Sequence, residues 1–278
     1  MLKLPNLPVS AASRAALADL QASVDARPDF ASRVALAKDL WNRKTSRAVN
    51  ANAFAEIRLT LSQMAFGSVR CAYCEDSAAD EIEHIAAKTV VPSRAFDWMN
   101  YCYACGPCNA PKGNQHATVD PAGVLTRLDP DTTTDEPTDP TALLDPRVDD
   151  YKAFLEIDIG GVTQTGQQLT PTSEFRAKTN LAPNAATRAA YTVEVLRLNR
   201  EVVRKARETA LIAYRASLLE YAQDKANGLP QADLNQRRDA ILAMPHPSVL
   251  NELLRQAATQ PKVQLAVAMA PEIATWLR

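Results

Sequence analysis

The segment YCYACGPCNAPKG, residues 101–113, holds most of the cysteines of this 278-residue chain. Its three cysteines lie three positions apart, at Cys102, Cys105 and Cys108. The remaining two form an upstream C-x-x-C pair, Cys71 and Cys74. Two C-x-x-C turns supply four sulfur atoms, which is the ligand set of a tetrahedral structural zinc site. Spacing alone leaves open whether the second pair is Cys102 with Cys105 or Cys105 with Cys108.

The compartment and the charge of the chain limit how these cysteines can be interpreted. The first residues lack the apolar core of a signal peptide, and no apolar run approaches the roughly 18 residues of a membrane span. We therefore expect a cytoplasmic protein without a membrane partner, in which clustered cysteines indicate Zn²⁺ rather than disulfides. The formal net charge of −1 gives no overall attraction to a polyanion, so a nucleic-acid site would have to be local.

The rest of the chain predicts an α+β protein that is mainly α. Hydrophobic residues make up 46% of the sequence, and many of them are alanine and leucine, which favour helices. We expect a small zinc-stapled core embedded between two helical regions. The predicted divisions are an N-terminal helical region at 1–67, the core at 68–125, an acidic Pro/Thr-rich segment with a hairpin at 126–183, and a C-terminal helical region at 184–278.

Several local expectations can be compared directly with a structure. Gly67 is predicted to cap the third N-terminal helix, because glycine commonly follows a helix end. A hairpin is expected around Gly160 and Gly161, and a solvated loop is expected over residues 128–150. One long helical pattern begins near Asn184. Prolines mark the joints between the short helices expected near the end of the chain.

Residues suited to hydrolytic chemistry lie between and directly after the cysteine pairs. Glu83 and His84 are adjacent, and a neutral imidazole can take a proton from water. Neighbouring residues of a strand point to opposite faces, so both can serve one site only if the strand ends or bulges there. Asn109 and Lys112 are three apart and share a face if a helix begins near Pro107.

The order of these motifs from Cys71 to Asn114 resembles the HNH endonucleases of the cysteine-flanked, zinc-stapled kind. The family fold is a ββα-metal unit, in which a hairpin and a short helix surround a divalent ion. The resemblance implies that His84 is the general base and that Asn100 braces the loop carrying it. It also implies that Glu83 and Asn109 are the protein ligands of a catalytic Mg²⁺ or Mn²⁺ in an H-N-N variant.

The same resemblance resolves the choice of zinc ligands. The final position of the family motif directly follows the second C-x-x-C pair, and here that position is Asn109. The implied structural zinc ligands are Cys71, Cys74, Cys105 and Cys108. Cys102 then remains a spare thiol on a strand, so Cys102→Ser should keep zinc and activity, whereas Cys108→Ser should lose both.

Contacts with nucleic acid are expected from lysine and arginine side chains near the predicted site. Lys112 is predicted to contact a phosphate, and Lys88 and Arg94, in the loop after His84, are further candidates. A basic stripe is also predicted on the C-terminal helical pattern, because four arginines recur there at helical spacing. They are Arg197, Arg200, Arg204 and Arg207.

Outside the core, residues 54–75, 143–161 and 191–207 are similar to the HNH nuclease subunits of bacterial anti-phage systems of the Septu type, some of them associated with retrons. Those nucleases work beside an ATPase with an SMC/ABC-like head. The resemblance implies a DNA endonuclease that acts as the effector of an anti-phage defence complex, with DNA and such an ATPase as its partners. The alternative is a non-catalytic, zinc-stapled nucleic-acid-binding or adaptor module.

Overall fold

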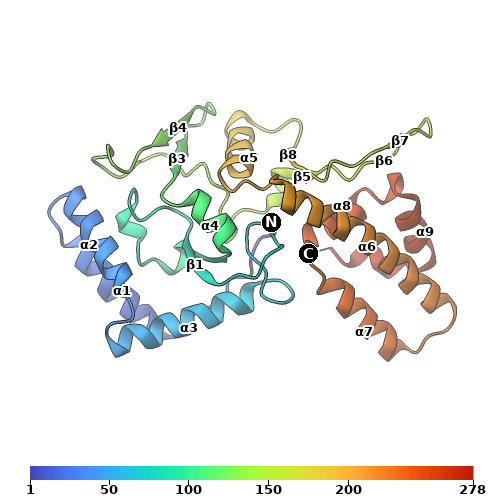
Figure 1. Ribbon diagram of the computed structural model, residues 1–278, viewed down its shortest axis with the longest axis horizontal. Helices are drawn as coiled ribbons and strands as arrows, with labels where there is room; N and C mark the ends of the chain where they lie inside the picture. The colour runs from blue at the N-terminus through green and yellow to red at the C-terminus, as the bar shows by residue number, and fades with distance from the viewer. Residues whose placement is uncertain (278) are drawn as a thin grey trace.

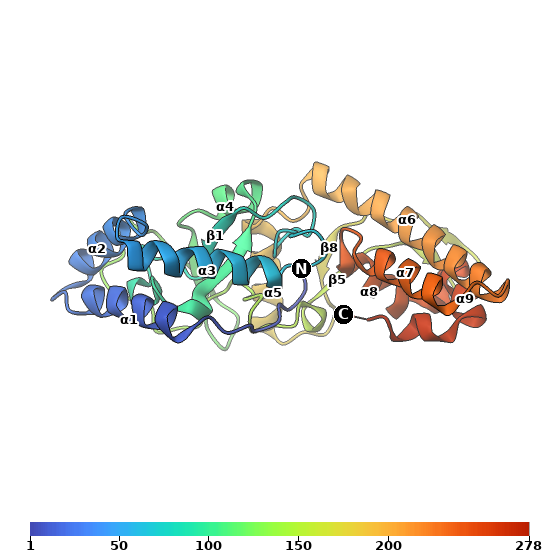
Figure 2. The same cartoon turned by 90° about the horizontal axis from the view of Figure 1, so that it is seen from below.

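The computed structural model describes residues 1–277, and in it the chain forms an elongated molecule (Figure 1). The N-terminal helices lie at one end and the C-terminal helices at the other, with the cysteine-rich segment between them. Figure 2 shows the same division from a perpendicular direction. The N-terminus lies near the middle of the molecule in these views.

The N-terminal region is a set of three helices that packs against the cysteine-rich segment. These are α1 (Ala11–Asp25), α2 (Phe30–Asn42) and α3 (Ala48–Met64). The side chains of Ser10 and Asp29 accept hydrogen bonds from backbone N–H groups in the first turns of α1 and α2, which fixes where these helices begin. The apolar face of α3 is buried, with every member at most 3% exposed: Phe54, Ile57, Leu61 and Met64.

The predicted end of α3 is wrong by a few residues. The helix ends at Met64, and the next residue, Ala65, is already extended. Gly67 lies beyond the helix, at φ +55°, where a Cβ atom would come within 2.5 Å of the carbonyl oxygen of Ala243. The glycine is therefore required by this close approach of the C-terminal region and not by the helix terminus.

The central segment is a hairpin followed by a short helix. Strand β1 (Glu81–His84) pairs antiparallel with β2 (Tyr101–Ala104), and α4 (Gly106–Lys112) follows directly. The loop between the strands contains the 3₁₀ turns η1 (Pro92–Arg94) and η2 (Trp98–Asn100). A second hairpin, β3 (His116–Val119) with β4 (Leu125–Leu128), crosses the boundary predicted at residue 125.

The acidic segment is only partly the solvated loop that was predicted. Its stretch at 142–147 is buried, and Arg147 is fully inaccessible to solvent. The Arg147 guanidinium donates to the Tyr101 carbonyl oxygen at 2.9 Å and lies 4.6 Å from the Trp98 ring centroid. A buried guanidinium needs such partners, so this residue fastens the acidic segment to the corner where η2 meets β2.

The hairpin expected around Gly160 and Gly161 has its turn elsewhere. After η3 (Tyr151–Ala153), strand β5 (Leu155–Ile157) pairs with β8 (Phe175–Ala177), and β6 (Gly161–Val162) pairs with β7 (Gln168–Leu169). The turn therefore lies between β6 and β7. At Gly160 a Cβ atom would lie 2.3 Å from the Leu169 carbonyl oxygen, so the glycine permits a close backbone contact.

The long C-terminal helical pattern is interrupted. Helix α5 (Pro183–Val195) ends before α6 (Glu201–Ala226) begins, and Arg197 between them has φ +48°. The Asn199 side chain accepts from the N–H of Phe175 at 2.8 Å and donates to its carbonyl oxygen at 2.9 Å. By bonding to the edge of β8, Asn199 competes with helix continuation, as asparagine often does.

The remaining helices follow the predicted proline joints. They are α7 (Gln231–Leu242), α8 (Pro247–Arg255) and α9 (Pro261–Met269), with the 3₁₀ turns η4 (Ala257–Thr259) and η5 (Pro271–Thr275). Helices with small antiparallel two-stranded sheets confirm an α+β fold that is mainly α. Within residues 1–277, none of the helices has both the length and the apolar character that a membrane span requires.

Candidate metal centre and adjoining pocket

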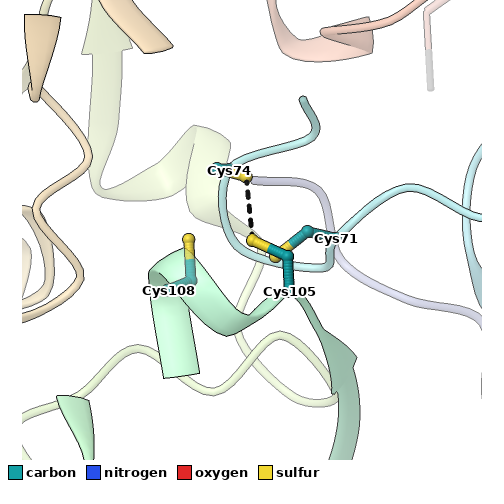
Figure 3. Close-up of side chains that lie close together, drawn as sticks. All are labelled: Cys71, Cys74, Cys105 and Cys108. Atoms are coloured by element: carbon teal, nitrogen blue, oxygen red, sulfur yellow. Dashed lines mark hydrogen bonds between the residues drawn. The ribbon is translucent and has the colours of Figure 1, made fainter. Parts of the chain in front are cut away.

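Four buried cysteines converge where the loop before β1 meets the start of α4 (Figure 3). They are Cys71, Cys74, Cys105 and Cys108, and their sulfur atoms all lie within 4.8 Å of one another. The Sγ atoms of Cys74 and Cys105 are 3.8 Å apart. Tetrahedral zinc with Zn–S bonds of about 2.3 Å places its sulfur ligands about 3.8 Å from each other. The cluster could therefore hold a metal ion such as zinc.

Cys102 is not part of this cluster. It lies within β2, opposite Glu83 in the register, and is fully buried. Burial raises the pKa of its thiol, so it remains protonated and unreactive. The pair chosen through Asn109, Cys105 and Cys108, does cluster with the upstream pair, and Cys102 does not.

A cation from the C-terminal region also contacts the cluster. Arg200, the residue before α6, donates from both Nη1 and Nη2 to the Cys108 sulfur, each at 3.5 Å. Hydrogen bonds from the neighbouring thiols, that of Cys105 first, hold the pKa of Cys74 well below its usual range. Four thiolates around a divalent ion carry excess negative charge, and a guanidinium beside one of them offsets part of it. No sequence motif indicated this contact.

A pocket of about 130 Å³ adjoins this centre, between β1, α4 and the end of α2. It is lined by four of the residues predicted for the site and by a tryptophan from α2, namely Glu83, His84, Lys88, Asn109 and Trp41. The hairpin, the loop that follows β1 and the short helix thus bring most of the predicted residues to one place. The sequence did not predict Trp41 as a pocket residue, because its position in a helical pattern indicates only an apolar side chain.

His84 is the last residue of β1, so it can reach the pocket beside Glu83, as the prediction required. Its Nε2 lies 2.9 Å from the Ala95 carbonyl oxygen, which can only accept, so Nε2 carries the proton and Nδ1 is the basic nitrogen. The Tyr101 hydroxyl donates to the same carbonyl at 2.7 Å. Burial, assisted by the charge of Lys88, holds the pKa of His84 well below its ordinary value, so the ring is neutral at neutral pH.

Glu83 and Lys112 form a buried ion pair. The Lys112 ammonium lies 2.6 Å from Glu83 Oε1, and the side chains are 1% and 6% exposed, respectively. Lys112 also donates to the His84 carbonyl oxygen at 2.7 Å. Burial raises the pKa of Glu83, and the nearby ammonium opposes that rise. Lys112 was expected to contact a phosphate, but its ammonium points inward. Within residues 1–277 it is the only cation in an ion pair with the buried Glu83 carboxylate.

Asn109 is bound to an acid that the sequence interpretation missed. Its Nδ2 donates to Glu81 Oε2 at 2.5 Å, which leaves Oδ1 as the side-chain atom available to a ligand. Glu81 and Glu83 are two apart on β1 and so lie on the same face of the strand. This alternation in the segment EIEH was the signal that could have identified Glu81.

Asn100 makes the contacts expected of a residue that braces the loop after His84. Its Oδ1 accepts from the Ala86 N–H at 2.7 Å, and its Nδ2 donates to the carbonyl oxygens of Ala86 at 3.0 Å and Arg94 at 2.8 Å. The side chain is fully buried. Asn100 thus ties the start of the loop at Ala86 to Arg94, the residue before Ala95, whose carbonyl oxygen accepts the hydrogen bond from His84 Nε2.

Arg94 and three of the four arginines of the predicted stripe are bound to other groups of the protein. Arg94 lies in η1 and pairs with Asp97, with Nε 3.0 Å from Oδ2. The predicted arginine stripe does not form, because the helix is interrupted and its members have separate partners. Arg207 is fully buried and donates to the Ser173 carbonyl oxygen, Arg200 contacts the cysteine cluster, and Arg204 pairs with Glu208.

Comparison with known proteins gave no relative. No family model, no curated protein and no solved structure matches the chain. The cysteine cluster and the adjoining pocket are therefore the features from which a function can be argued.

Proposed function

We propose that this protein is a metal-dependent DNA endonuclease of the HNH kind, with His84 as the base that activates water. One observation carries the proposal. An acid, a histidine with a free basic nitrogen and an asparagine line a single pocket on a hairpin–helix unit that ends in a four-cysteine cluster. The motif order from Cys71 to Asn114, which resembles that family, supports the same conclusion.

The cysteine cluster would hold a structural Zn²⁺ rather than a catalytic one. A catalytic zinc keeps one position open for water, whereas four cysteine ligands complete the tetrahedron. Cys108 belongs to α4, as does Asn109, and Cys105 directly follows β2. Zinc binding would therefore fix the short helix against the hairpin and so hold Asn109 beside the pocket.

The chain's own residues can prepare water for attack on a phosphodiester. His84, neutral and held in one tautomer by the Ala95 carbonyl, would accept a proton from water at Nδ1. The resulting hydroxide would attack phosphorus, the bond to the leaving oxygen would break, and that oxygen would take a proton from solvent, giving a phosphate monoester and a hydroxyl group. General-base assistance of this kind is typically worth about 10²–10⁴-fold in rate.

The oxygens around the pocket suit a hard divalent cation. Mg²⁺ prefers oxygen ligands and keeps several waters, so few protein ligands are needed. Glu83 would contribute a carboxylate oxygen and Asn109 its Oδ1, since Lys112 pairs with Glu83 at Oε1 and Glu81 accepts only from the Asn109 amide nitrogen. When bound, Mg²⁺ or Mn²⁺ would stabilise negative charge on the phosphate and on the leaving oxygen.

The biological setting proposed here rests on resemblance outside the core. Residues 54–75, 143–161 and 191–207 are similar to nuclease subunits of Septu-type and retron-associated systems. We therefore propose an effector of an anti-phage defence complex whose partner is an SMC/ABC-like ATPase. Co-expression with the candidate ATPase and co-purification on size exclusion tests this part, and migration of the two proteins as separate peaks would contradict it.

A second candidate function is a non-catalytic, zinc-stapled nucleic-acid-binding or adaptor module. The buried pair of Glu83 and Lys112 favours it, because the acid that would bind the catalytic ion already has a cationic partner. In that case zinc would still be bound, but adding Mg²⁺ or Mn²⁺ would not lead to strand cleavage.

Plasmid cleavage distinguishes the two candidates. Zinc-loaded protein is incubated with supercoiled plasmid and Mg²⁺ or Mn²⁺, and nicked and linear products are followed on a gel. The His84→Ala variant is the test, and His116→Ala is a matched control, since His116 is an equally buried histidine on β3 that does not line the pocket. The proposal requires cleavage that EDTA stops and that only His84→Ala abolishes. Equal cleavage by His84→Ala would remove His84 as the base.

A further inference from the structure

The pocket is completed by the N-terminal helical region. Trp41, near the end of α2, lines the pocket together with His84, and the two ring centroids are 4.1 Å apart. Trp41 also contacts Phe54 on α3 at 5.6 Å between centroids, which ties it to the packing of the N-terminal helices. The end of α2 therefore forms one side of the pocket, and its position is set by packing within the N-terminal helices.

Two lysine side chains lie close to Trp41 on this side of the pocket. The Lys44 ammonium lies 4.4 Å from the centroid of the Trp41 ring, and the Lys88 ammonium lies 5.7 Å from the same centroid. Lys88 itself lines the pocket. Burial lowers the pKa of both lysines, and like charge contributes, from Arg58 at Lys44 and from Lys112 at Lys88. Glu83 is the nearby acid that opposes this shift at Lys88.

Lys44 and Lys88 form no ion pair with a carboxylate among residues 1–277. The Lys112 ammonium is bound to Glu83, and Arg94 is bound to Asp97. Among the ion pairs found in residues 1–277, none involves Lys44 or Lys88, although Lys44 donates to the Trp41 carbonyl oxygen at 3.3 Å. A cation that is partly withdrawn from water and has no carboxylate partner is stabilised by an incoming anion.

The surface around Lys44 extends this positive charge. The segment KDLWNRKTSR at 38–47 carries four cations against one acid, although the whole chain has a net charge of −1. Lys38, Arg43 and Arg47 are all exposed. The charge is therefore concentrated at the end of α2, next to the pocket, where a chain of phosphates could continue beyond the site.

We propose that Lys44, together with Lys88, binds the phosphate backbone of nucleic acid beside the pocket, so that the end of α2 is part of the substrate-binding surface. Lysines suit this task because their ammonium groups act as point charges toward phosphate oxygens. A backbone held here lies directly beside His84. The inference deepens the proposed nuclease function and rests on it for its biological meaning, but it can be tested by binding alone.

The test measures binding of a fluorescent DNA duplex by anisotropy over a series of salt concentrations. All proteins carry His84→Ala, so that cleavage does not interfere, and the comparison is between Lys44→Ala, Lys44→Ala/Lys88→Ala and Lys262→Ala. Lys262 is an exposed lysine on α9, at the opposite end of the molecule from α2 (Figure 1). Zinc content and circular dichroism confirm that each variant is folded.

Each lost phosphate contact should lower the slope of log affinity against log salt by about 0.9 for duplex DNA. Lys44→Ala should therefore weaken binding and flatten the slope by about one contact, and the double variant by about two. Lys262→Ala should bind like its parent. Equal binding by Lys44→Ala and Lys262→Ala would overturn the inference, as would displacement of the duplex by polyglutamate as readily as by unlabelled DNA.

The binding and cleavage assays can contradict the two proposals separately. If the otherwise wild-type protein does not cleave plasmid but Lys44→Ala still loses duplex binding, the binding surface stands and the nuclease proposal falls. If plasmid is cleaved and Lys44→Ala binds normally, the nuclease proposal stands and the binding surface falls. A parent protein that does not bind the duplex at all overturns the inference.

Discussion

Replacing Asn100 by alanine should destabilise the protein strongly, because this one buried side chain bonds to three backbone groups, two of them on the buried residue Ala86. These are the N–H and carbonyl of Ala86 and the carbonyl of Arg94. A buried polar group left without a partner costs about 1–3 kcal/mol. Water entering the space left by the amide would recover part of this, so we expect a loss of about 3–5 kcal/mol in the free energy of unfolding.

The Asn100→Asp variant separates the contribution of the hydrogen bonds to stability from that of side-chain size. Aspartate has nearly the same size and can still accept from the Ala86 N–H, but it places an oxygen against the two carbonyls that now receive N–H groups. We therefore expect this variant to be about as unstable as Asn100→Ala. Asn109→Ala is the control, because that half-buried side chain makes a single bond to the exposed Glu81, and we expect its change to be within about 1 kcal/mol.

The measurement is urea unfolding followed by circular dichroism, with zinc supplied in excess to every variant. The midpoint and the slope give the free energy of unfolding in water. The reasoning would be refuted if Asn100→Asp were as stable as the wild type. It would also be refuted if Asn100→Ala lost less than about 1 kcal/mol, since the loop would then not depend on these hydrogen bonds.

Three further variants test the metal centre and the buried ion pair. Cys102→Ser should keep one zinc per chain by elemental analysis, whereas Cys108→Ser should lose it, and the opposite pattern would contradict the assigned ligands. Arg200→Ala should increase the rate of zinc transfer to a coloured chelator, with an affinity loss of about 10–100-fold, because both hydrogen bonds to the Cys108 sulfur are lost. An unchanged rate would assign Arg200 no part in holding the metal. Lys112→Met should lower the free energy of unfolding in urea by about 3–5 kcal/mol, because Glu83 is left buried without its partner. A loss below about 1 kcal/mol would show that the pair contributes little.

The parts of the site that the sequence predicts well are those that depend on short-range spacing. A C-x-x-C turn brings its own two sulfurs together, whereas the choice of Cys108 over Cys102 came from the family resemblance, which puts Asn109 directly after the second pair. The hairpin and the short helix that hold these residues are also local in the chain. For the same reason the positions of the α8 and α9 starts follow from their prolines.

The parts that were missed depend on contacts between distant segments. Arg200 lies 92 residues from Cys108 and was predicted to belong to a helical stripe, because nothing in its own segment shows that Asn199 interrupts the helix. Trp41 reaches the pocket only through the packing of α2 against the loop after β1. The inward position of Lys112 likewise depends on β1, since a lysine on a short helix reads as exposed until its partner strand is known.

The measurement that bears most directly on the central claim is the rate of plasmid cleavage by the zinc-loaded protein in Mg²⁺ or Mn²⁺, compared with that of His84→Ala. We predict cleavage by the wild type and a loss on the order of 10²–10⁴-fold in the variant, with zinc content unchanged. His116→Ala should retain activity. Cleavage by His84→Ala at the wild-type rate, with both proteins carrying zinc, would contradict the account.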